Sequence, residues 1–359
     1  MSFSRNDTKM IKGMAIILMF YHHLFAFPER LQENITYVSS FYLGENSISF
    51  HIGEFGKLCV ALFMFLAGYG TYLSSKKEEN LSFLGKKIIN LYRVYWQVFL
   101  LVVPISIIIG KGWKGFVLKE FIWNLIGLDI TYNGEWWFFT TYIILIFAFP
   151  GIKKFIDRKN SYFIYDVLCI VLVNAIIMLL VPEIVSMPLC EKLSSSLIWI
   201  KLYQAMTWLP VFMFGCVFAK YDVLSTVKKK FSGNYLSILI SILILAGVFY
   251  MRHIYYSKYD FINAPIFICG LVVALSGRIG RCIQPILIKI GEESTIIWLT
   301  HSFYCYKWCQ KLVYAPKYAP LIVLWLLSIT YVTSRVVKAL WGNFELLYFK
   351  NKEKLKVFK

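Results

Sequence analysis

Long apolar runs recur along the whole chain, and short polar segments separate them. An α-helix needs about 20 mostly apolar residues to cross a bilayer, so the pattern predicts an all-α, polytopic membrane bundle of about ten helices. We treat residues 1–359 as a single transmembrane domain. The helices are expected at residues 10–28, 55–74, 88–109, 136–152, 161–182, 198–219, 234–251, 261–277, 286–306 and 319–341.

The distribution of Lys and Arg predicts the orientation of this bundle. If the N-terminus is cytoplasmic, the inner segments hold roughly 23 of these residues and the outer loops about 10. Cytoplasmic loops carry the excess of basic residues, so both termini are expected on the cytoplasmic side of the plasma membrane. The basic inner loops, which explain the net charge of +18, then face anionic lipid headgroups. Nucleic-acid binding is disfavoured, because no soluble basic domain is present to carry it out.

Composition supports the membrane interpretation. Hydrophobic residues make up 58% of the chain and charged residues only 16%, whereas soluble domains carry about a quarter charged residues. The first apolar run contains histidines and lacks a small-residue cleavage site, so it is interpreted as a retained helix. The eight cysteines are scattered without a C-x-x-C pair, so neither a metal site nor a disulfide framework is expected. Within residues 110–135 the pattern indicates an amphipathic interfacial or re-entrant helix, with a packed outer loop as the alternative.

The first expected helix carries two adjacent histidines, His22 and His23, among apolar residues. Ionisable groups inside a membrane are costly and usually face the bundle interior. Lys12 and His23 lie within about 20° of the same helix face, and His23 lies roughly 16 Å further along the axis. Arg5 and Lys9 continue this basic stripe, whereas His22 points about 100° away and is not expected to share a pocket with His23 equally. A positive-inside anchor with a hydrogen-bonded histidine is the simpler alternative.

The ninth expected helix repeats this arrangement. It begins near Lys289 and reaches His301 roughly 18 Å further along. Ser294 shares a face with His301, so the two helices predict a common internal cavity with His23 and His301 at similar depth. Two unrelated core histidines remain the alternative.

Further candidates lie on other helices. Arg93 could pair with a phosphate or could extend to the interface as a solvated arginine. Glu135 beside Trp136 and Trp137 suits a sugar acceptor, although an aromatic belt explains the tryptophans as well. In "FGKLCVALFMFLAGYGTYL", the small residues Gly56, Ala67, Gly68 and Gly70 are expected to permit close helix contact, with backbone approach to a ligand as the alternative.

Taken together, these segments resemble the membrane acyltransferase-3 family, integral-membrane O-acyltransferases of cell-surface polysaccharides. The family's Arg, ten residues, then His is matched by Lys12 and His23, and its Phe-rich segment by "VALFMFLAGY". The stretches "YRVYW", "NGEWWFFTTYIILIFAFP" and "IGEESTIIWLTH" are similar to three later motifs, in family order. Two positions depart from the family: its Arg is Lys12, and its Ser before Gly is Ala67. Lys keeps the charge but loses the bidentate fork of Arg.

The resemblance implies transfer of an acetyl group from cytoplasmic acetyl-CoA to a hydroxyl of a cell-surface or exported polysaccharide. His23 would act as general base or take the acetyl group transiently, and His301 would orient the acceptor or polarise the thioester. Acetyl-CoA would be a co-substrate with no tightly bound cofactor. The expected donor-binding residues are Lys12, Lys9, Arg5 and Arg93, and the expected acceptor-binding residues are Glu135, Trp136 and Trp137.

Other function classes stay open. Intramembrane histidines also suit a proton-coupled transporter or a polysaccharide flippase, although no inverted repeat is evident in the sequence. A membrane acyltransferase of the MBOAT group fits the order of the motifs less well. The acceptor would be a glycan or lipid-linked saccharide of unknown identity, and a homodimer is compatible with the sequence.

Overall fold

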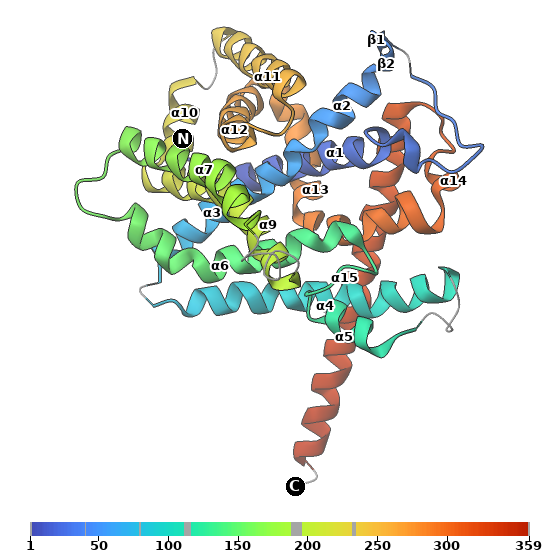
Figure 1. Ribbon diagram of the computed structural model, residues 1–359. Coiled ribbons are helices and arrows are strands. Elements are labelled where there is room, and N and C mark those ends of the chain that lie inside the picture. Colours follow the sequence, from blue (N-terminus) through green and yellow to red (C-terminus); the bar gives the residue numbers. More distant parts are fainter. Residues whose placement is uncertain are drawn as a thin grey trace.

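The computed structural model describes residues 2–39, 41–78, 80–110, 116–187, 196–231 and 235–357 as a helical bundle (Figure 1). Within these residues, seven helices are long and apolar enough to cross a membrane. The structure thus confirms a polytopic helical membrane fold. The other expected spans are helical too, but their crossing of the bilayer and the side on which the termini lie stay predictions.

The helices follow the apolar runs closely, and each of the ten expected segments contains one. The long helices are α1 (Arg5–Phe25), α3 (Leu58–Ser75), α4 (Ser82–Gly110), α6 (Trp137–Ile156), α7 (Phe163–Val185), α9 (Leu197–Lys220), α11 (Tyr235–Tyr255), α12 (Asp260–Ser276), α13 (Arg278–Ser302) and α15 (Ala319–Val357).

Shorter elements connect them. These are η1 (Pro28–Arg30), β1 (Tyr42–Leu43), β2 (Asn46–Ser47), α2 (Ile48–Gly56), α5 (Leu118–Leu125), η3 (Gly134–Trp136), α10 (Val223–Phe231), the π-helical segment η5 (Phe303–Trp308) and α14 (Gln310–Val313). The strands β1 and β2 pair antiparallel as a small hairpin. Residues 110–135 contain the helix α5, whose place relative to the bilayer stays a prediction, and residues 111–115 lie outside the described residues.

Helix α1 is polar at its start and packs along α13. A capping box begins it, in which the backbone N–H of Asp7 donates to Ser4 Oγ (3.2 Å) and that of Ser4 donates to Asp7 Oδ2 (2.7 Å). A side chain at Gly291 would place its Cβ 1.9 Å from the Lys9 carbonyl oxygen. The two helices therefore approach with their backbones in contact, which only glycine permits at this position.

A second pair, α3 and α9, forms the centre of the bundle. A Cβ at Gly68 would lie 2.0 Å from the carbonyl oxygen of Phe212, and a Cβ at Gly215 would lie 2.0 Å from that of Phe65. The expectation that Gly68 permits close contact is thereby confirmed. At the periphery, α7, α11 and α15 expose large apolar side chains, among them Leu179 and Leu243. Such faces are suited to lipid.

The second expected span is longer than predicted and is broken. It begins at Ile48 instead of residue 55, and a turn at Lys57 separates α2 from α3. Arg252 Nη1 donates to the carbonyls of Glu54 and Phe55, each at 2.7 Å, and its guanidinium holds Asp260 in a bidentate pair at 2.7 and 3.0 Å. These hydrogen bonds satisfy carbonyl groups at the C-terminal end of α2. The buried Arg252–Asp260 ion pair therefore stabilises the break between α2 and α3.

Helix α15 also differs from prediction. The expected helix 319–341 continues to Val357, and Figure 1 shows its last part extending beyond the body of the bundle to the C-terminus.

Candidate active site

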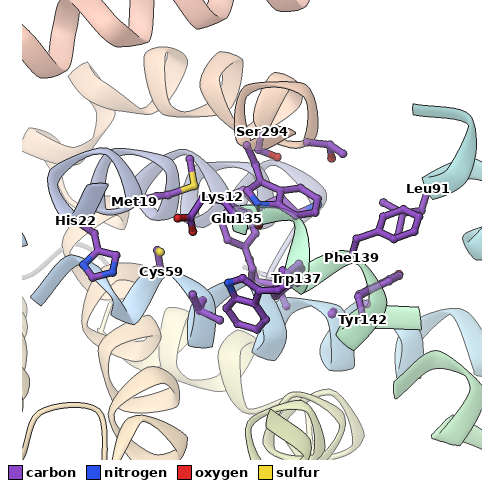
Figure 2. Close-up of a pocket in the computed structure, with 18 of the residues that line it drawn as sticks. Lys12, Met19, His22, Cys59, Leu91, Glu135, Trp137, Phe139, Tyr142 and Ser294 are labelled. Carbon is purple, nitrogen blue, oxygen red and sulfur yellow. Dashed lines mark hydrogen bonds between the residues drawn. The ribbon is translucent and has the colours of Figure 1, made fainter. Parts of the chain in front are cut away.

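One internal cavity of about 380 Å³ lies between α1, the α2–α3 break, α4, α6 and α13 (Figure 2). Helix α1 contributes Thr8, Lys12, Met19, His22 and His23 to its lining. Figure 2 shows the His22 ring beside Cys59 on one side of the cavity, with Leu91 and Tyr142 on the opposite side. The common cavity predicted for α1 and α13 is present, because Ser294 of α13 lines it together with His23.

The cavity is long and has two chemically different ends. Thr8 and His23 both line it, and their separation of 15 positions corresponds to about 22 Å of helix. One end carries the amines of Lys12 and Lys87. The other carries His22, His23 and the carboxylate of Glu135, so cationic groups and reactive groups share one narrow space.

Hydrogen bonds fix the tautomer of His23. Tyr306 Oη donates to the carbonyl of His23 (2.9 Å), so its single proton is used. His23 Nδ1 lies 2.9 Å from the same oxygen and must therefore donate to it. The proton of the neutral ring is on Nδ1, and Nε2 presents a free lone pair. Tyr306 belongs to η5, a π-helical segment that directly follows α13.

A carboxylate faces the free nitrogen of His23. Glu135 Oε2 lies 3.6 Å from His23 Nε2, and Glu135 Oε1 lies 3.7 Å from Arg30 Nη1. Arg30 also donates to Tyr306 Oη at 3.3 Å. The sequence thus predicted Glu135 but missed Arg30 and Tyr306. No pattern in the sequence marked either residue as part of the site, because Arg30 lies in an expected outer loop and Tyr306 lies at the end of an expected span.

His301 packs against His23 but lies outside the cavity wall. The two ring centroids are 4.8 Å apart, and His301 is fully buried. His301 Nδ1 lies 2.7 Å from the carbonyl of Trp298 and donates to it, while its Nε2 has no partner in the described structure. The depth match between the two histidines is therefore present, but His301 is not among the residues that line the cavity. Its direct contact with substrate stays a prediction.

His22 lies in the cavity wall as well, although helix geometry points its side chain about 100° away from that of His23. Its ring lines the same cavity as His23, and the two ring centroids are 5.2 Å apart. The helical angle between the two Cα positions did not account for the turn at Lys57, which extends the cavity around α1 to the His22 side. His22 Nδ1 donates to the carbonyl of Gly53 (3.0 Å), so its Nε2 is also a free acceptor.

The four predicted donor-binding cations divide into two groups. Lys12 lines the cavity, whereas Lys9, Arg5 and Arg93 are not among its lining residues. Lys9 forms a 2.7 Å ion pair with Glu292, and Arg5 and Arg93 are exposed. The contact of these three with a donor remains a prediction.

Two cavity cations were missed by sequence reasoning. Lys87 lines the cavity because α4 begins at Ser82, whereas the expected helix began after it at residue 88. Lys57 lines it because α2 and α3 meet there.

The two predicted tryptophans occupy different environments. Trp137 lines the cavity and stacks with Trp208 at 6.0 Å between centroids. Trp136 is buried outside the cavity, where its Nε1 donates to the carbonyl of Leu299 (3.0 Å). Trp136, the last residue of η3, thus links the start of α6 to α13, and Trp137 is the one of the pair that lines the cavity and can contact a ligand there.

Comparison with known families agrees with this geometry. A family model described as an acyltransferase domain, that of the acyltransferase-3 family, matches residues 8–337. The chain belongs to the acyltransferase-3 family. It is a membrane acyltransferase. Searches of curated proteins and of solved structures found no significant match. Among the described residues, no group of three or more His, Cys, Asp or Glu is arranged to hold a metal ion.

Both positions that depart from the family motifs face the cavity. Lys12 and Ala67 line it, so an Arg or a Ser at these positions would change the cavity itself and not only the packing. Gly70, close to Ala67 on α3, also lines the cavity, and a Cβ there would meet nothing within 4 Å. Gly70 is therefore not a packing glycine like Gly68.

Proposed function

We propose that this acyltransferase moves an acetyl group from cytoplasmic acetyl-CoA to a hydroxyl of a cell-surface or exported polysaccharide. The observation that carries the proposal is the single cavity that joins Lys12 and Lys87 to the free Nε2 of His23. Acetyl-CoA has a polyanionic head and a long arm that ends in a thioester. The negative charge of its phosphates is complementary to the two lysine amines. The arm that carries its thioester is of the same order of length as the cavity.

In this proposal, Lys12 and Lys87 bind donor phosphates at the cytoplasmic end. The pantetheine arm lies along the cavity and brings the thioester carbonyl to His23. The acceptor hydroxyl approaches from the end at which Glu135 and Trp137 line the wall. Trp137 offers a flat apolar surface to a sugar ring, while Glu135 accepts a hydrogen bond from a sugar hydroxyl.

The chemistry then needs one base. His23 Nε2 takes the proton of the acceptor hydroxyl as its oxygen attacks the thioester carbonyl carbon. The tetrahedral intermediate collapses, the carbon–sulfur bond breaks, and His23 returns the proton to the departing thiolate. The products are the acetyl ester and free coenzyme A.

The groups around His23 favour the general-base role over a transient acetyl-histidine. Glu135 Oε2, 3.6 Å from Nε2, stabilises a proton on that nitrogen through an ion pair that forms only when the ring is charged. An acetyl group on Nε2 would occupy the space between the ring and this carboxylate. Tyr306 holds the ring in the tautomer that either role requires.

The test is acetyl-CoA binding and turnover by purified protein in detergent in the presence of saccharide acceptors, whose hydroxyl the reaction requires, followed by release of free thiol. We expect His23→Gln to retain binding and lose thiol release by at least 100-fold, the lower range for loss of a general base. Lys12→Gln and Lys87→Gln should weaken binding instead.

Matched controls separate these effects from folding. His253→Gln changes an exposed histidine outside the cavity, and Lys86→Gln changes the exposed neighbour of Lys87. Both should behave as wild type. Full thiol release by His23→Gln would refute the assignment of the base, and absence of acetyl-CoA binding by folded wild-type protein would direct attention to transport.

A further inference from the structure

The turn between α2 and α3 places a second cation, Lys57, at the histidine end of the cavity. Gly56 packs tightly on α1, since a Cβ there would lie 2.2 Å from the carbonyl oxygen of Leu18 and 3.1 Å from His22 Cβ. Lys57, the next residue, therefore lies next to the turn of α1 that carries His22. Lys12 lies ten residues before His22 on α1, about 15 Å along the helix axis, so Lys57 and Lys12 lie toward opposite ends of the cavity.

Two neighbouring pairs of charges are already matched to each other, whereas the exposed Lys57 has no ion-pair partner among the described residues. Arg252 and Asp260 form their buried pair at 2.7 Å, and Arg30 lies 3.7 Å from Glu135. Asp260 acts on Lys57 only at longer range, and its charge is already matched by Arg252. Across the described ranges of the chain, no carboxylate lies within 4.0 Å of the Lys57 amine.

His22 supplies a complementary group beside this cation. Its Nδ1–H is committed to the carbonyl of Gly53, so the Nε2 that remains can only accept a hydrogen bond while the ring is neutral. The neutral His22 ring cannot neutralise an anion, but its Nε2 can accept a hydrogen bond from a hydroxyl group. A ligand that meets both Lys57 and His22 needs an anionic group and a hydroxyl close together, which acidic saccharides have.

We propose that Lys57 binds an anionic group of the acceptor and that His22 accepts a hydrogen bond from a neighbouring acceptor hydroxyl. The acceptor is then an acidic saccharide, bearing a carboxylate or a phosphate, whose reacting hydroxyl lies at His23. This inference rests on the proposed acetyl transfer and adds the chemical class of the acceptor to it.

The test measures binding of three defined probes to the purified full chain by quenching of tryptophan fluorescence. The probes are methyl glucoside, methyl glucuronide and glucose 1-phosphate, which share a sugar ring and differ in charge. Wild type should bind at least one anionic probe about tenfold more tightly than the glucoside, the effect of one charge-assisted hydrogen bond. Comparison of the glucuronide with the phosphate distinguishes the two sources of charge.

Variants decide whether Lys57 is responsible. Lys57→Gln should abolish the difference between charged and neutral probes, and Lys57→Glu should reverse it, while glucoside binding and acetyl-CoA binding stay at wild-type levels. His22→Phe, which keeps a ring but loses the acceptor nitrogen, should weaken all three sugars. Lys311→Gln, at an exposed lysine of α14, is the control and should change nothing.

Each outcome is decisive. Equal or absent binding of charged and neutral probes, or a preference that persists in Lys57→Gln, overturns the subsite. A loss of acetyl-CoA affinity in Lys57→Gln also overturns it, because Lys57 would then serve the donor. If wild type neither binds nor turns over acetyl-CoA, the proposed acetyl transfer fails, independently of the sugar measurements.

Discussion

Replacing Tyr306 with phenylalanine tests how the tautomer of His23 is set. The hydroxyl accepts from His23 Nδ1, donates to the His23 carbonyl and accepts from Arg30, at 2.9, 2.9 and 3.3 Å. Phenylalanine keeps the ring and removes all three bonds. The proton of the neutral imidazole is then free to move to Nε2, and a protonated Nε2 has no lone pair with which to act as a base. A ring in that tautomer cannot take the acceptor proton.

The expected loss follows from the energy of one hydrogen bond. A net contribution of about 1–1.5 kcal/mol for the bond that selects the tautomer shifts the tautomer ratio roughly tenfold, and kcat should fall by up to that factor. The KM for acetyl-CoA should change little, because Tyr306 is not among the residues that line the cavity. Thiol release measured over a range of acetyl-CoA concentrations separates the two parameters.

Tyr314 provides the matched control. Its hydroxyl also donates to a carbonyl of α1, that of Leu24, but it does not touch the His23 ring. Tyr306→Phe and Tyr314→Phe should lose similar thermal stability, whereas only Tyr306→Phe should lose kcat. An unchanged kcat in Tyr306→Phe, or an equal loss in both variants, would show that the hydroxyl does not set the tautomer of His23.

Three further outcomes are expected. Lys12→Arg should retain acetyl-CoA binding within a few-fold of wild type, because the charge remains, and a tenfold loss in a binding titration would contradict a charge-based contact. Gly291→Ala should lower the melting temperature and activity because its Cβ meets the Lys9 carbonyl, whereas Gly151→Ala, with nothing within 4 Å, should do neither. Arg252→Met should destabilise the protein by about 3–5 kcal/mol by leaving Asp260 buried and unpaired, and chemical unfolding should show a smaller cost when Asp260→Leu is added; equal costs would argue against the pair.

The candidate site was only partly predictable. His23, Lys12 and Ser294 could be placed in one cavity because each stands on a long helix whose period determines which face it occupies. Glu135 lies in the short segment η3, so helix periodicity did not place it beside His23. His22 also lines this cavity, and whether the two histidine rings serve a ligand unequally stays a prediction. The position of His22 depends on the turn at Lys57, which follows from a contact with Arg252 nearly 200 residues later.

The amino-acid sequence by itself determined the membrane class and the positions of the helices, because a run of about 20 apolar residues indicates a membrane helix without any knowledge of distant contacts. The motif order likewise predicted the family. Only the tertiary structure decided which polar groups meet around His23. Tyr306 reaches it from a sequence distance of 283 residues, and Arg30 and Glu135 come from separate connecting segments. Such convergence depends on how closely helices pack, and glycine contacts such as that of Gly291 with the Lys9 carbonyl set that distance only once the bundle is assembled.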